Sequence, residues 1–174
     1  IRALIRQHNQ IKLIGVSGRE GLPSPRLLET YVPLTLRDYD DESASNIDLI
    51  RNLNTNPYIV ILGEPGAGKS TILDWLTIIS SKELVHKPPN KKIPLPIYLP
   101  LRACDKSKET MLSIINNPTW LPIESSVPER FFDKYLEKGE CLVLFDGLDE
   151  VVDEKERDLV SDKIIQFVYS YPKN

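Results

Sequence analysis

Eight consecutive residues have the composition of a phosphate-binding loop. Gly63-Glu-Pro-Gly66-Ala-Gly68-Lys69-Ser70 matches the pattern G-x-x-x-x-G-K-[ST] in full. A phosphate chain binds against several backbone N–H groups at once, and glycines let the backbone curl around it. We predict that the following residues contact phosphate: Gly63, Glu64, Pro65, Gly66, Ala67, Gly68, Lys69, Ser70 and Thr71.

Three side chains at the end of this loop have distinct expected roles. Lys69 would bring a mobile positive charge to the outer phosphates, and Thr71 would reach the inner one. The Ser70 hydroxyl would bind Mg²⁺. A helix that begins here would also point its positive end at the anion.

A second chemical feature is an aspartate that follows an apolar run. Cys141-Leu-Val-Leu-Phe145 is fully apolar and is followed at once by Asp146. A buried strand of this kind delivers its last residue to the carboxyl edge of a sheet, where α/β proteins bind ligands. Mg²⁺ needs a carboxylate from outside the phosphate loop. We therefore predict that Asp146 binds Mg²⁺, directly or through water.

Two further carboxylates, Asp149 and Glu150, follow Asp146 by three and four residues. Either one could orient or deprotonate the water that attacks the γ-phosphate. The alternative is that they cap the following helix, a role that Asp153 and Glu154 also fill. We predict that at least one of the pair is catalytic together with Lys69, and the sequence does not decide between them.

Strands that alternate with helices must position these residues. Apolar runs predict three strands, at Tyr58–Leu62, Leu95–Leu101 and Cys141–Phe145, and the first of these is expected to be a buried parallel strand. Helical patterns lie between and after them, at 69–81, 110–116, 126–139 and 153–171. This order predicts an α/β fold with a parallel sheet, and the phosphate loop lies between a strand and a helix as its motif requires.

The residues before the first predicted strand are less regular. They suggest a short helix over 1–10, strands at 11–16 and 31–36, an exposed linker at 38–45 and a helix near 47–53. Proline restricts the middle of the chain, with eight of its 14 prolines between Pro88 and Pro128. Three of these lie in or beside the Leu95–Leu101 run, which predicts a partly unpaired strand.

Composition excludes several classes of protein. The 174 residues are 41% hydrophobic with a net charge of −3, values that exclude general disorder and argue against nucleic-acid binding through bulk charge. No apolar run is long enough to span a bilayer. Cys104 and Cys141 lack metal-binding partners, so we expect a cytoplasmic protein. Cys141 lies in an apolar run, so we expect it to be a buried thiol. His8 and His86 are expected to lie on the surface.

The two motifs together resemble those of the NACHT family of STAND signalling ATPases. GEPGAGKST is followed later in the chain by LVLFDGLDEV. In the family, the acidic strand ends with the pattern D-(G/A/S)-x-D-E. This chain has that pattern at Asp146, Gly147, Asp149 and Glu150. Ordinary AAA+ ATPases end this strand in adjacent Asp-Glu instead. The resemblance covers about 47–152.

The resemblance implies a P-loop NTPase three-layer sandwich that binds ATP or ADP with Mg²⁺. Family members are switches that hydrolyse ATP slowly, are closed with ADP and form homo-oligomers with ATP. Effector and sensor regions flank the core, often in innate immunity or antiphage defence. The alternatives are an AAA+ motor with sustained turnover and a non-catalytic nucleotide-gated scaffold. A small-molecule phosphotransferase lacks an acceptor motif.

The resemblance also predicts an incomplete sheet. The family places a strand with a sensor arginine between the two motif strands, and this strand should follow the helix that ends near Tyr171. We therefore expect residues 1–46 to be a lead-in and 47–174 to be the N-terminal part of a NACHT domain. Without the remainder of its chain, such a fragment is expected to be poorly stable, inactive and unable to switch.

Overall fold

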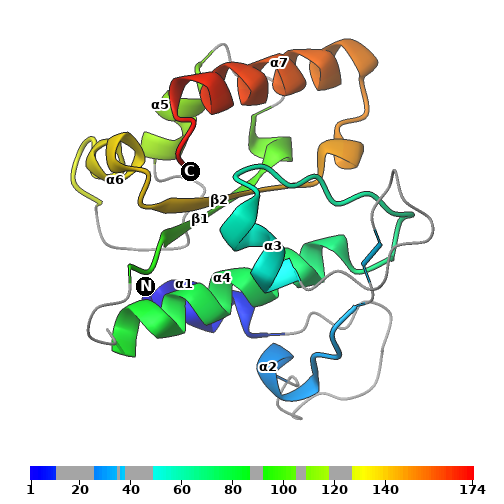
Figure 1. Ribbon diagram of the computed structural model, residues 1–174. Helices are drawn as coiled ribbons and strands as arrows, with labels where there is room; N and C mark the ends of the chain where they lie inside the picture. The colour runs from blue at the N-terminus through cyan, green and yellow to red at the C-terminus, as the bar shows by residue number, and fades with distance from the viewer. Residues whose placement is uncertain (11–25, 35, 38–48, 87–91, 105–108, 118–126) are drawn as a thin grey trace.

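Two parallel strands lie between two groups of helices in the computed structural model (Figure 1). The structure describes residues 1–10, 26–34, 36–37, 49–86, 92–104, 109–117 and 127–174. Its elements in chain order are α1 (Arg2–His8), α2 (Leu27–Thr30), α3 (Leu49–Thr55), α4 (Lys69–His86), β1 (Leu95–Pro100), η1 (Leu101–Ala103), α5 (Met111–Asn116), α6 (Asp133–Lys138), β2 (Cys141–Asp146), η3 (Leu148–Glu150) and α7 (Glu154–Ser170).

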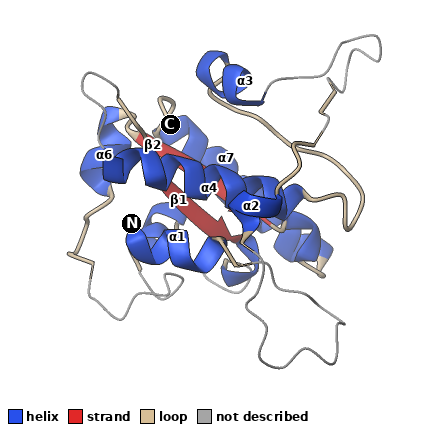
Figure 2. Cartoon of the chain, turned by 90° about the horizontal axis from the view of Figure 1, so that it is seen from below, coloured by secondary structure: helices blue, strands red, loops and turns tan. Residues whose placement is uncertain are grey.

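The strands β1 and β2 pair in parallel, with Leu95 opposite Cys141 and Pro100 opposite Asp146. Because side chains alternate along a strand, each face of this ribbon has its own set of residues. On one face, Tyr98 and Leu144 pack with the apolar side of α4, which crosses the strands in Figure 2. The opposite face packs toward α5, α6 and α7.

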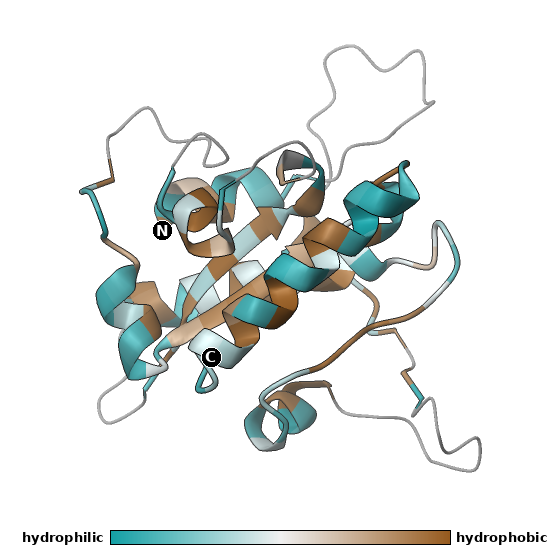
Figure 3. Ribbon diagram, turned by 90° about the horizontal axis from the view of Figure 1, so that it is seen from above, coloured by the Kyte–Doolittle hydropathy of each residue, from teal (hydrophilic) through white to brown (hydrophobic). Residues whose placement is uncertain are grey.

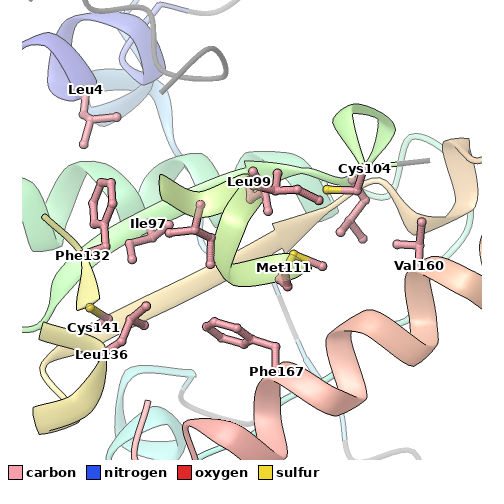
Figure 4. Packing of buried hydrophobic residues seen from close by; sticks show 13 residues of the cluster. Leu4, Ile97, Leu99, Cys104, Met111, Phe132, Leu136, Cys141, Val160 and Phe167 are labelled. Carbon is pink, nitrogen blue, oxygen red and sulfur yellow. The ribbon is translucent and has the colours of Figure 1, made fainter. Parts of the chain in front are cut away.

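The larger hydrophobic cluster fills the space on that second side of the ribbon. It joins strand residues such as Ile97 and Leu99 to Met111 of α5, Leu136 of α6 and Phe167 of α7 (Figure 4). Hydrophobic and hydrophilic residues both occur along α7 (Figure 3). Burial of one side of each helix therefore holds the second layer against the strands.

Local sequence signals explain where several helices begin and end. The Asp153 side chain accepts from the Glu156 amide at 3.0 Å and caps α7, and Thr110 does the same for α5 through Ser113 at 3.2 Å. Gly139 ends α6 in the left-handed region with φ of 67°. The predicted helices at the start of the chain, at 47–53, at 69–81, at 110–116 and at 153–171 are confirmed, with the third extended to His86.

The prediction of a buried parallel strand at Tyr58–Leu62 is wrong for this structure. The segment pairs with no described strand, and the side chains of Val60 and Leu62 are 80% and 66% exposed. The Tyr58 hydroxyl donates to the Pro172 carbonyl at 3.0 Å. A strand needs a hydrogen-bonded neighbour, and the apolar composition of the run cannot supply one.

Smaller corrections concern other element boundaries and faces. Residues 31–34 form no strand, and α6 begins at Asp133 because residues 129–132 form turns, with Arg130 at a φ of 57°. In α7, Val160 and Phe167 are buried, whereas Leu159 is 57% exposed. The predictions for 11–16 and 38–45 lie outside the described residues.

The two cysteines are buried. Cys104 and Cys141 are both thiols and form no disulfide bond with each other. Burial, followed by the charge of Glu140, raises the pKa of the Cys141 thiol to about 12, so this thiol stays protonated near neutral pH. Within the described part of the chain, no helix combines the length and the apolar character needed to cross a membrane.

Candidate functional site

The phosphate-binding pattern forms a loop that leads directly into α4. The loop turns at Pro65 and Gly66, and α4 begins at Lys69 as the motif requires. Gly66 and Gly68 have φ angles of 81° and 90°, in the left-handed region that favours glycine. A Cβ atom on Gly68 would lie 2.8 Å from Leu34 Cδ1. The positive φ therefore favours glycine at position 68, and a larger residue would also make the end of the Leu34 side chain shift.

The Lys69 ammonium lies between the loop and the acidic motif. Its Nζ donates to the carbonyls of Gly63 at 2.8 Å and Glu64 at 3.2 Å, and it forms an ion pair with Asp149 Oδ2 at 3.2 Å. The lysine side chain is 23% exposed, so solvent only partly screens these contacts. The predicted phosphate-binding lysine and a predicted catalytic carboxylate are thus in direct contact.

Ser70 and Asp146 form the second link between the two motifs. The Ser70 hydroxyl donates to Asp146 Oδ1 at 3.0 Å, across 76 residues of sequence. A hydroxyl and a carboxylate are hard oxygen donors, which suit Mg²⁺. No group of three or more His, Cys, Asp or Glu suited to a metal occurs among the described residues. In Mg²⁺ sites that bind nucleotides, phosphates and water complete the shell around one or two protein ligands.

The remaining acidic residues lie in η3, directly after Asp146. Gly147 adopts a φ of 78°, and a Cβ atom there would lie 3.1 Å from Glu150 Cδ. The Glu150 carboxylate lies 4.0 Å from Arg102 Nη1, and both side chains are largely exposed. Asp153 caps α7, so neither Asp149 nor Glu150 is needed for that role. Both carboxylates therefore remain accessible beside the phosphate loop.

The other predicted loop residues lie around this centre without side-chain contacts that fix a role. Glu64 contributes its backbone carbonyl to Lys69 and also accepts from the Ala67 amide at 3.1 Å, which closes the turn around Pro65. Thr71 is exposed in the first turn of α4.

Tyr98 was not among the residues that the motifs indicated, yet it contacts Asp146. Its hydroxyl donates to Asp146 Oδ2, the oxygen that Ser70 leaves free. Burial, then the hydrogen bond to Asp146 and its negative charge, raises the pKa of Tyr98 far above its ordinary value. The phenol therefore remains a donor. Tyr98 lies on the same face of the two-stranded ribbon as Asp146. The register between the strands is needed to see this, so the motifs alone could not indicate Tyr98.

His8 is buried, which corrects its expected surface position. It is 6% exposed, and its Nδ1 is hydrogen-bonded to Asp74 on α4. Its ring lies 4.5 Å from that of Tyr98, centroid to centroid. No local pattern around His8 indicates this, because Asp74 and Tyr98 both lie far away along the chain. His86 is exposed as expected and contacts the Lys82 carbonyl at 2.7 Å.

A comparison with known families identifies the stretch that contains both motifs. Residues 57–167, well over half of the chain, match the family model described as the NACHT domain. Comparison with curated proteins and with solved structures gave no match.

Substitutions of the two loop glycines separate the cost of a positive φ from the cost of a contact with Leu34. Gly66→Ala and Gly68→Ala both place a side chain at positive φ, which costs about 1–2 kcal/mol, but only the second also collides with Leu34. We expect Gly68→Ala to lower the melting temperature of the nucleotide-free protein more than Gly66→Ala does. Adding Leu34→Ala to Gly68→Ala should recover part of the loss. Equal effects of the two single variants would show that Leu34 does not press on the loop.

Proposed function

The chain belongs to the NACHT domain family of nucleotide-binding NTPases, and on that premise we propose that it forms part of an ATP- and ADP-binding regulatory switch. The observation that carries this proposal is the double link between the motifs, Lys69 to Asp149 and Ser70 to Asp146. These contacts bring a cation, a hydroxyl and two carboxylates together at the start of α4. They are the groups that binding and cleaving a nucleoside triphosphate needs.

The phosphates would lie in the loop, against its backbone amides and the N-terminus of α4. This 18-residue helix directs its positive end at the loop. Lys69 already lies among the loop carbonyls, so a small movement of its flexible stem would bring its charge to the outer phosphates.

Ser70 and Asp146 are the residues that would hold Mg²⁺. Mg²⁺ bound there would supply positive charge to neutralise the phosphate oxygens. The 3.0 Å hydrogen bond between the two side chains places their oxygens together before any ligand binds. This preorganisation favours binding, because less freedom is lost when the ligand arrives.

Asp149 and Glu150 would act on the attacking water. Asp149 is paired with Lys69, and it would be released when phosphate takes over the ammonium. Glu150 is held loosely, 4.0 Å from Arg102, and is free to turn toward the site. Both positions suit a general base or a water-orienting group, and we propose that at least one serves this purpose.

The switching role is inferred from the family. We propose slow hydrolysis, a closed state with ADP, and homo-oligomers with ATP, in immune or antiphage signalling. We also propose a cytoplasmic location, because the buried thiols of Cys104 and Cys141 suit a reducing compartment.

The phosphate-binding role of Lys69 predicts a loss of affinity on Lys69→Ala. A hydrogen bond to a charged group contributes about 1.5–3 kcal/mol, so we expect ATP and ADP to bind at least about 10- to 100-fold more weakly. Calorimetry on the full-length protein measures this. Lys82→Ala, an exposed position on the same helix, is the control and should bind normally. Wild-type affinity in Lys69→Ala would exclude the proposed site.

The catalytic carboxylates predict a separation of binding from hydrolysis. At least one of Asp149→Asn and Glu150→Gln should slow ATP hydrolysis about 100-fold while ATP still binds, because a general base contributes on that order. Glu154→Gln, exposed at the start of α7, is the control.

Unchanged hydrolysis in both variants would contradict these roles. Unchanged signalling in a variant that cannot hydrolyse ATP would support the nucleotide-gated scaffold. Sustained rapid turnover in the wild type would favour the AAA+ alternative.

A further inference from the structure

The carboxylate of Asp146 is held from two sides. Ser70 donates to Oδ1 at 3.0 Å, and the Tyr98 hydroxyl donates to Oδ2. The strand register explains the second contact. Tyr98 lies opposite Leu144 on β2, and Asp146 is the next residue along on the same face. A long aromatic side chain reaches such a diagonal neighbour across two strands.

Tyr98 is itself held in place by residues from two helices. Its ring contacts the ring of His8 at 4.5 Å between centroids, with a tilt of 56°. His8 is buried at the end of α1 and is anchored by its Nδ1 to Asp74 of α4. Asp74 lies one helical turn beyond Ser70 on the same helix. The phenol is therefore packed between the ribbon and the α1–α4 pair.

We propose that Tyr98 is a positioning residue for Mg²⁺ binding, which fixes the Asp146 carboxylate so that Oδ1 faces Ser70 and the metal. This inference rests on the proposed function, because it requires Asp146 to be a Mg²⁺ ligand. His8 and Asp74 support it by holding the Tyr98 ring against the strand.

The physical reason lies in the freedom of a carboxylate. Rotation about the last bond of aspartate is broad and roughly two-fold, so an unrestrained Asp146 would sample many orientations. Mg²⁺ accepts only near-octahedral geometry at short distances. Groups that orient a metal ligand from behind typically contribute about 10- to 100-fold to metal affinity. The Tyr98 hydroxyl occupies the place of such a group.

Tyr98→Phe in the full-length protein tests the inference, because it removes the hydroxyl and keeps the ring that packs on His8. Calorimetry measures ATP affinity with Mg²⁺ and with EDTA. We expect the affinity gained from Mg²⁺ to fall about 10-fold or more, while the affinity in EDTA stays unchanged. Tyr169→Phe, 81% exposed on α7, should leave both values unchanged.

Two results would overturn the positioning role. One is a Mg²⁺-dependent gain equal to that of the wild type. The other is an equal loss with Mg²⁺ and with EDTA, which would show that the hydroxyl merely supports the fold.

Asp146→Asn distinguishes failure of this inference from failure of the proposed site. If Asp146→Asn loses the Mg²⁺-dependent gain and Tyr98→Phe keeps it, only the role of Tyr98 is wrong. If Asp146→Asn keeps the gain, Asp146 is not the Mg²⁺ ligand, and the site and the inference both fail.

Discussion

The contact between Ser70 and Asp146 constrains most of the described structure. The two residues are 76 positions apart, and their hydrogen bond requires the start of α4 to meet the end of β2. That meeting is possible only if α4 packs along the strand face that carries Asp146. Leu144 and Tyr98 of this face, with Ile72 and Leu76 of α4, provide the apolar contact that keeps the helix there. Packing across this single face thus positions the chemistry at its edge.

Charge and backbone shape act together at that edge. The Lys69 ammonium contacts loop carbonyls and the Asp149 carboxylate, which compensate its positive charge when no phosphate is bound. Gly66, Gly68 and Gly147 all adopt positive φ there, which other residues rarely accept. Lys69 at the end of the phosphate loop and the acidic turn therefore carry opposite charges, and both segments contain glycines in the left-handed region.

The N-terminal lead-in contributes more to this arrangement than its irregular sequence suggested. Helix α1 packs on α4 and supplies His8, while Leu34 lies against Gly68 of the loop. Tyr31 stacks on Trp75 of α4 with ring centroids 4.9 Å apart. These contacts reach the phosphate loop and the first two turns of α4, so the described lead-in residues pack beside the loop.

The sequence alone predicted the two motifs, most helices and the apolar runs that form β1 and β2, and it singled out Lys69, Ser70, Asp146, Asp149 and Glu150. These follow from local patterns, because glycine spacing, apolar runs and caps act over a few neighbouring residues. Only the tertiary structure decided that Tyr98 and His8 join the site and that Tyr58–Leu62 stays unpaired. Those outcomes depend on strand register and on partners distant in sequence. A segment becomes a paired strand, and a histidine becomes buried, only when the fold brings another part of the chain against it.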